Sequence, residues 1–149
     1  MRIPDLFFVI INPTVRLLLR SPLHRFWSHS LMLITFTGRS SGRVYTTPVR
    51  YLRSGDAIWA FTSVENQWWR NLGNGAPVRL RLQGSEHAYR AEAITDAPER
   101  VRAALAEFLV HFPQDAPYYD IRMDAERHPL GADLDRAATR TVWVQAYLQ

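Results

Sequence analysis

The chain has 149 residues, of which 47% are hydrophobic and 21% are charged, a composition typical of a globular domain with a buried core. It contains no cysteine, which excludes disulfide bonds, thiolate metal sites and cysteine nucleophiles and fits a reducing compartment such as the cytoplasm. All 18 basic residues are arginine. Codon bias explains this pattern most simply, but any anion held by a fixed side-chain charge is then held by planar guanidinium groups.

The positive charge is concentrated in the first part of the chain. Residues 1–30 carry a net charge of +3, residues 31–90 carry +5 and residues 91–149 carry −4. The basic part is expected to face an anionic partner such as a phosphate, a lipid head group or a nucleic acid. Arg79 and Arg81 share one strand face, but no aromatic residues alternate with them, so we expect no nucleic-acid partner.

Two short helices are predicted near the N-terminus, over residues 13–20 and 22–29. Each begins with an N-cap residue followed by proline, in Asn12-Pro13 and Ser21-Pro22. The first helix is amphipathic, which predicts packing on the body of the domain or, alternatively, peripheral contact with the inner face of a membrane. No segment has the length of a membrane span and none has the features of an export signal, so we expect a cytoplasmic protein.

The middle of the chain is predicted to form strands separated by turn signals. The predicted strands are residues 31–37, 44–53, 57–62, 78–83 and 87–94. The alternation of apolar and polar residues is clearest where Val78, Leu80 and Leu82 alternate with arginine and glutamine. Short connections require neighbouring strands to pair antiparallel, and such a set with one solvated face predicts a small barrel.

The last part of the chain is predicted to add one helix and one strand. Asp96 and Glu99 have the spacing of a capping box at the start of a helix over residues 96–112. Residues 113–138 are expected to be irregular, and residues 139–148 to close the barrel as a strand. The fold class is therefore α+β, with about six mainly antiparallel strands and one amphipathic helix packed outside, and we expect a single domain.

The segment from Gly38 to Arg43, GRSSGR, has two chemical interpretations. Its first five residues match the G-x-S-x-G pattern of serine hydrolases, which would make Ser40 a nucleophile. Asp120 and His128 follow in the required order. That pattern requires a helix directly after the turn, however, and the next residues, Val44-Tyr45-Thr46, are typical of a strand.

The second interpretation is a site for phosphate. Glycines at both ends of the turn permit backbone conformations that point N–H groups outward as an anion nest. Arg39 and Arg43 can bind phosphate oxygens, and the hydroxyl groups of Ser40 and Ser41 add donors. A solvated hairpin turn with no ligand is the alternative that the spacing leaves open.

Adjacent tryptophans, Trp68 and Trp69, form the second unusual segment. In a short helical turn both cannot face the core, so one is expected to line a surface cleft where a flat ring can stack. The alternative is that both are ordinary core and rim aromatics. The five histidines show no metal-ligand spacing, so we expect no metal site.

Three motifs in this order resemble the deazaflavin-dependent nitroreductase family. The first is Leu33–Arg43. The second consists of two neighbouring segments, Thr46-Thr47-Pro48-Val49 and Tyr51–Asp56, and the third is Trp68–Leu72. The resemblance covers residues 31 to 94, with a looser fit at both ends. It implies a split β-barrel related to flavin-mononucleotide-binding oxidoreductases, and it implies coenzyme F420 as the cofactor. Family members reduce quinones and nitroaromatics, and some associate with membranes or bind fatty acids.

The resemblance also implies a set of site residues. The turn at residues 38–43 would bind the cofactor phosphate, and the segment from Thr62 to Trp69 would lie against the deazaflavin ring. Tyr118 and Tyr119 would border the substrate pocket, where one of them would donate a proton or hydrogen bond. The implied cofactor-binding residues are Arg39, Ser40, Ser41, Gly42, Arg43, Thr47, Pro48, Thr62, Ser63, Trp68, Trp69 and Asn71.

The sequence departs from the family pattern at three places. Ser40 replaces a lysine of the turn, Trp69 stands where tyrosine is usual, and Val64-Glu65-Asn66 replaces a longer loop with a glycine pair and a lysine. These departures keep flavin mononucleotide (FMN) open as an alternative cofactor. A non-catalytic lipid- or fatty-acid-binding barrel is the alternative function, and the protein is expected to be a monomer or a homodimer.

Overall fold

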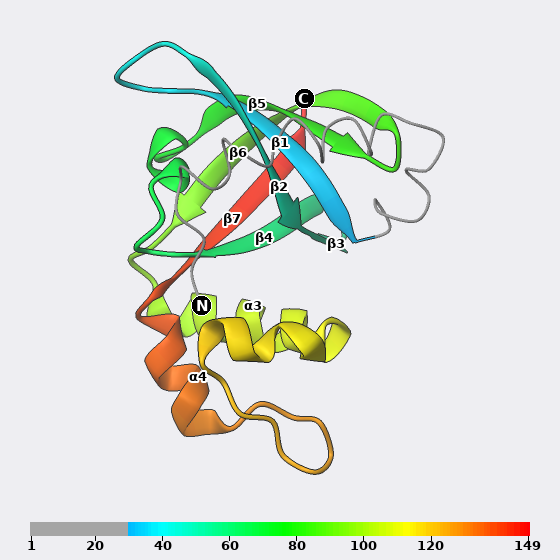
Figure 1. Cartoon of the computed structure of the whole chain (residues 1–149), viewed down its shortest axis with the longest axis vertical. Helices are drawn as coiled ribbons and strands as arrows, with labels where there is room; N and C mark the ends of the chain where they lie inside the picture. The colour runs from blue at the N-terminus through cyan, green and yellow to red at the C-terminus, as the bar shows by residue number, and fades with distance from the viewer. Residues whose placement is uncertain (1–29) are drawn as a thin grey trace.

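A computed structural model describes residues 30–149. The two predicted N-terminal helices, and the membrane contact predicted for them, lie outside these residues. Figure 1 shows a curled sheet with the two helices of residues 98–111 and 131–138 gathered at one end. The strands are β1 (Leu31–Thr37), β2 (Val44–Arg50), β3 (Leu52–Ser54), β4 (Ala57–Ser63), β5 (Ala76–Leu82), β6 (Ser85–Ile94) and β7 (Thr141–Leu148). None of the described helices is long and apolar enough to cross a membrane.

All seven strands belong to one antiparallel sheet in the order β2-β1-β5-β6-β7-β4-β3. The two edge strands, β2 and β3, are consecutive in the chain, so the sheet curls into a split barrel. The single strand predicted over residues 44–53 is divided at Tyr51, which raises the strand number from about six to seven. At this residue the chain leaves its partner β1 and begins to pair with β4, a corner that local sequence pattern does not reveal.

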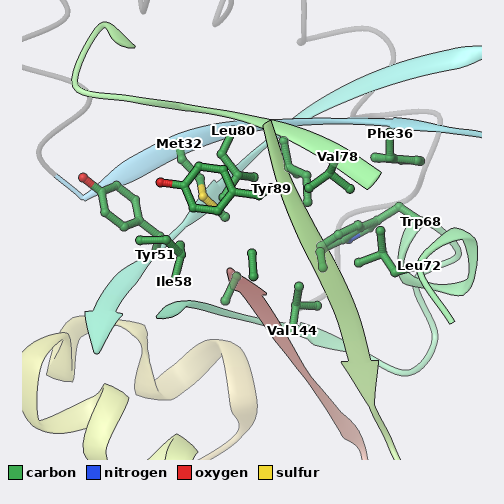
Figure 2. Packing of buried hydrophobic residues seen from close by; sticks show 14 of the residues in the cluster. Met32, Phe36, Tyr51, Ile58, Trp68, Leu72, Val78, Leu80, Tyr89 and Val144 are labelled. Atoms are coloured by element: carbon green, nitrogen blue, oxygen red, sulfur yellow. The ribbon is translucent and has the colours of Figure 1, made fainter. Parts of the chain in front are cut away.

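The interior of the barrel is filled by alternate residues of the strands. Val78, Leu80 and Leu82 of β5 all point inward, which confirms the predicted alternation in this strand. The short helix η1 (Trp68–Asn71) also contributes to this core. Figure 2 shows Trp68 beside Leu72 and Phe36 among the inward side chains.

A second core lies between the sheet and the helix α3 (Pro98–His111). The predicted apolar face of this helix is confirmed, since Val101, Leu105, Phe108 and Leu109 are all buried. The predicted capping box is wrong, because the N-cap is Ala97 and no side chain caps the helix. Proline at the first helical position fixes the start instead.

Residues 113–138 are more regular than predicted. They contain the 3-10 helix η2 (Pro113–Tyr119) and the helix α4 (Gly131–Ala138). Both are short and punctuated by proline or glycine, so their sequences carry weak helical periodicity. A fully buried carboxylate, Asp133, organises the loop between them. It accepts hydrogen bonds from the backbone N–H of Arg122 at 2.8 Å and from the Nε of the same residue at 2.9 Å.

Replacing Asp133 with asparagine is expected to weaken the fold at neutral pH but not in strong acid. Hydrogen bonds from Arg122 hold the pKa of this carboxyl far below its usual range. Its stabilisation is therefore complete above the unfolded-state pKa of about 3.9 and is lost as the pH falls below that value. Urea unfolding should show a clear loss of stability in Asp133→Asn at pH 7 that shrinks progressively below pH about 4.

Asp135→Asn, which removes an exposed carboxylate from the same helix, serves as the control and should have little effect at either pH. An equal loss of stability for Asp133→Asn across the whole pH range would contradict the electrostatic explanation and would indicate a packing defect.

Candidate functional site

The turn between β1 and β2 is tightly folded. The amide of Gly38 donates to the carbonyl oxygen of Arg43 at 2.7 Å, and the amide of Gly42 donates to the carbonyl oxygen of Gly38 at 2.9 Å. Gly42 has a φ of +71°, which glycine adopts without strain. A Cβ atom on Gly38 would lie only 2.9 Å from the ring of Tyr45, so glycine is needed there for close approach.

This folding uses most of the amides that were expected to form an anion nest. The amide of Arg43 donates to Oγ of Ser41 at 3.1 Å, and that of Arg39 donates to Oδ1 of Asn71 at 2.9 Å. Only the amides of Ser40 and Ser41 have no such bond within residues 30–149. The turn can therefore hold an anion mainly through its side chains, which differs from the predicted backbone nest.

The arginine side chains of the turn are available for an anion. Arg39 and Arg43 are exposed, and neither forms an ion pair with a carboxylate of the described residues 30–149. The hydroxyl of Tyr45 lies 3.5 Å from Oγ of Ser41. That contact, together with the nearby Arg43 guanidinium, lowers the pKa of Tyr45. The hydrogen bond with Ser41 is the larger cause, and the positive charge of Arg43 adds to it in the direction that would also attract a phosphate.

The turn and the helix that carries the tryptophan pair meet in space through Arg39 and Asn71, which are 32 positions apart in the chain. The link is Asn71, the last residue of η1. Its Oδ1 accepts the amide of Arg39, and its Nδ2 donates to the carbonyl oxygen of Trp68 at 2.9 Å. The side chain thereby fixes the turn against η1, and the two motifs singled out from sequence form one region.

The two tryptophans have different environments. Trp68 is 4% exposed and packs in the barrel core, with its ring 6.0 Å from that of Phe36. Trp69 is half-buried, and the guanidinium of Arg70 lies 5.0 Å from its ring centre. One tryptophan is thus a core residue, and of the two only Trp69 is partly exposed at the surface. Both indole Nε1 atoms are buried without a hydrogen-bond partner among the described residues.

A second group of predicted site residues gathers at the end of β4. Thr62 and Ser63 are both buried. The side chain of Asn66, which is 4% exposed, donates through Nδ2 to Oγ1 of Thr62 at 2.7 Å and to the hydroxyl oxygen of Tyr118 at 3.4 Å. Sequence reasoning missed Asn66, because a single asparagine in a short loop gives no local signal that it is buried.

The tyrosine pair lies on η2 and faces the end of β4. A cavity of about 20 Å³, enough for one water molecule, is lined by Ser63, Tyr118 and Tyr119. The two tyrosine rings meet edge to face, with their centres 5.0 Å apart. Burial raises the pKa of Tyr119 well above its usual value, so its hydroxyl is protonated at neutral pH and has a proton to donate to an acceptor.

Thr47 and Pro48 lie on β2, where they pair with Ile34 and Leu33 of β1. Thr47 is 2% exposed, and its Oγ1 has no partner among the described residues. No described residue contacts Ser40 as the histidine of a hydrolase would, and a strand follows the turn. The structural context that a serine-hydrolase elbow requires is therefore absent from residues 30–149.

The residues present fit an anionic cofactor with a flat ring in three respects. Two guanidinium groups at the turn lack carboxylate partners among residues 30–149, Asn71 joins the turn to the short helix that carries the half-buried Trp69, and buried polar atoms of Thr47 and Trp69 lack partners among the same residues. The backbone amides of the turn fit less well. A split barrel with such a site defines a flavin- or deazaflavin-binding type of oxidoreductase fold.

The family described as F420H(2)-dependent quinone reductase matches residues 19–143. The chain belongs to this family, which is one of F420-dependent reductases. No curated protein matches the sequence significantly.

Solved structures share the fold at low sequence identity. The FAD- and heme-binding protein of Mycobacterium smegmatis is 17% identical, with a TM-score of 0.51, over 87% of this chain and 67% of that protein. The general stress FMN/FAD-binding protein of Xanthomonas citri is 18% identical, with a TM-score of 0.51, over 84% and 82%.

The protein Atu2129 of Agrobacterium tumefaciens, of unknown function, is 17% identical over 80% of this chain, with a TM-score of 0.54. The chain spans about half the length of that protein, since the match covers 48% of it. At these identities the likeness establishes the split-barrel fold and nothing further.

Proposed function

We propose that the protein transfers a hydride from reduced F420 to a small organic acceptor of the quinone or nitroaromatic type. The observation that carries the proposal is the hydrogen bond from Arg39 to Asn71, which unites the arginine turn and the tryptophan segment in a chain of this family. F420H2, when bound, supplies the hydride, so the protein needs no nucleophilic side chain.

In this proposal the site residues bind and orient. Arg39 and Arg43 hold the phosphate of the cofactor tail through charge-assisted hydrogen bonds, which are the stronger kind. Trp69 borders the ring, and the buried Thr62 and Ser63 support it from the end of β4. Tyr118 and Tyr119 border the acceptor and keep water from it, with a protonated hydroxyl available as a hydrogen-bond donor.

The acceptor is expected to be a quinone, as the family description indicates. A flavin in place of F420 is the second candidate, because two proteins of the same fold are described as binding FAD or FMN. A solved structure described as a domain-swapped dimer shares the fold, and a homodimer is the assembly that we propose for this chain.

Cofactor titration tests the proposal. Purified protein is titrated with oxidised F420 and separately with FMN, followed by the change in cofactor fluorescence. We expect binding of F420 at micromolar concentration or tighter and weaker binding of FMN. The F420-loaded protein, supplied with F420H2, should reduce a soluble benzoquinone. Binding of neither cofactor, or of FMN alone, would overturn the assignment to F420, and co-purification of lipid with no cofactor binding would favour the lipid-binding alternative.

A further inference from the structure

Arg50, the last residue of β2, is held in one orientation by three contacts. Its Nε donates to Oδ2 of Asp115 at 2.6 Å, and its Nη1 donates to Oγ of Ser30 at 2.6 Å. Its guanidinium carbon lies 5.1 Å from the ring centre of Phe112. A guanidinium carries more N–H donors than these two bonds use, so a fixed cation keeps donors for a further acceptor.

Stability alone does not explain this ion pair. The side chains of Arg50 and Asp115 are partly buried, at 28% and 20% exposed, and desolvation reduces what such a pair contributes to stability. Burial raises the pKa of Asp115 even though Arg50 opposes that effect. Desolvation of the carboxylate therefore offsets its attraction to the guanidinium, so we expect the pair to add little to stability, which leaves a functional role for its charge to be tested.

The location of Arg50 connects this charge with the proposed substrate pocket. Asp115, to which Arg50 is bonded, lies on η2, and the same short helix carries Tyr118 and Tyr119, which line the small cavity at the end of β4. The arginine turn lies at the opposite end of β2, about 20 Å away at roughly 3.3 Å per strand residue. Arg50 is thus placed with the tyrosines and apart from the turn that would hold the cofactor phosphate.

We propose that Arg50 is a catalytic residue that stabilises the negative charge which develops on the oxygen of the acceptor. This inference rests on the proposed function. Hydride transfer from a reduced deazaflavin brings two electrons and one proton to a quinone and leaves the cofactor oxidised. The product is a hydroquinone monoanion, with its charge on oxygen, and a proton from solvent completes the hydroquinone. A fixed guanidinium beside that oxygen stabilises the charge as it forms.

A phenolate is a stable mimic of the hydroquinone monoanion, so its binding tests the proposal without turnover. The probe is 2,6-difluorophenol, whose fluorine NMR shift reports its ionisation near neutral pH. The probe is titrated on folded protein, without cofactor and again with oxidised F420. We expect the bound phenol to ionise at a pH about one unit lower than the free phenol. This shift should disappear in Arg50→Gln and survive in part in Arg50→Lys.

The replacement Asp115→Asn separates an electrostatic role from a structural one. Asparagine keeps a hydrogen-bond acceptor for Arg50 but removes the opposing charge, so the phenol should ionise at a still lower pH than on the wild-type protein. Within residues 30–149, the titratable groups nearest this pair on η2 are Tyr119 and, in ring contact with it, Tyr118. If Arg50 only fastened η2 to the barrel, both replacements would act in the same direction.

Turnover provides the second measurement. Arg50→Gln should lower kcat with a quinone by about 10²-fold while leaving the Kd for F420 unchanged. Arg102→Gln, which removes an arginine with a carboxylate partner between α3 and α4, is the matched control and should retain wild-type kcat. Failure of the wild-type protein to bind F420 or reduce quinones would overturn the proposed function. Unchanged phenol ionisation in Arg50→Gln, or no phenol binding at all, would overturn the role of Arg50.

Discussion

Replacing Trp68 with alanine is expected to destabilise the fold by about 3–5 kcal/mol. The side chain is 4% exposed and packs against Phe36 and Leu72 in the barrel core. Its removal leaves a cavity that rigid strands on several sides cannot fill. Urea unfolding followed by far-ultraviolet circular dichroism measures the loss without depending on tryptophan fluorescence.

Trp69→Ala is the matched control, since it deletes the neighbouring indole of the same helix. Trp69 is half-buried and contacts Arg70, so its loss should cost clearly less stability but should weaken F420 binding. Trp68→Phe keeps most of the buried ring and removes an indole N–H that has no partner among residues 30–149, so it should be tolerated much better than alanine. A loss below about 1 kcal/mol for Trp68→Ala would contradict the core assignment.

The sequence predicted those parts of the fold that have strong local periodicity. Val78, Leu80 and Leu82 alternate along β5, and Val101 and Leu105 share the buried face of α3. In both cases one face of the element is buried along its whole length, which is the condition under which hydrophobic periodicity identifies an element.

The features that the sequence did not reveal depend on contacts between distant segments. The division of one long strand at Tyr51 arises because the chain changes its pairing partner there. The helix α4 is only eight residues long and is stabilised through Asp133, whose partner Arg122 lies eleven residues earlier. Neither effect leaves a periodic pattern in the sequence.

The candidate site shows the same difference between features that have a local sequence motif and features that depend on distant contacts. The turn and the tryptophan pair stand out as motifs, and their union through Asn71 agrees with the resemblance that placed them together. Arg50 and Asp115 are separated by 65 positions and join only through the closure of the barrel onto η2. The side chains of such a pair have no local signature, so the structure was needed to find them.

Replacing both Arg39 and Arg43 with alanine is expected to raise the Kd for F420 by about two decades. A hydrogen bond to a charged group contributes about 1.5–3 kcal/mol, and the lower value applies to each arginine because both are exposed. The two losses add to about 3 kcal/mol of binding free energy. Because about 1.4 kcal/mol corresponds to a tenfold change in Kd, this sum corresponds to about two decades. Fluorescence titration at two ionic strengths measures the effect, and the double variant should lose most of the salt dependence seen in the wild-type protein.

The control for the double variant of Arg39 and Arg43 removes two positive charges from another part of the molecule. Arg100 and Arg102 lie on α3, far along the chain from the turn, and Arg102 already has a carboxylate partner. If only the overall positive charge attracts the cofactor, replacing this pair will weaken binding as much as replacing the turn pair. A local site predicts that the α3 variant binds like the wild type, because charges beyond about 10 Å are largely screened at ordinary salt. Equal effects for the two double variants would therefore exclude the turn as the anchor of the cofactor phosphate.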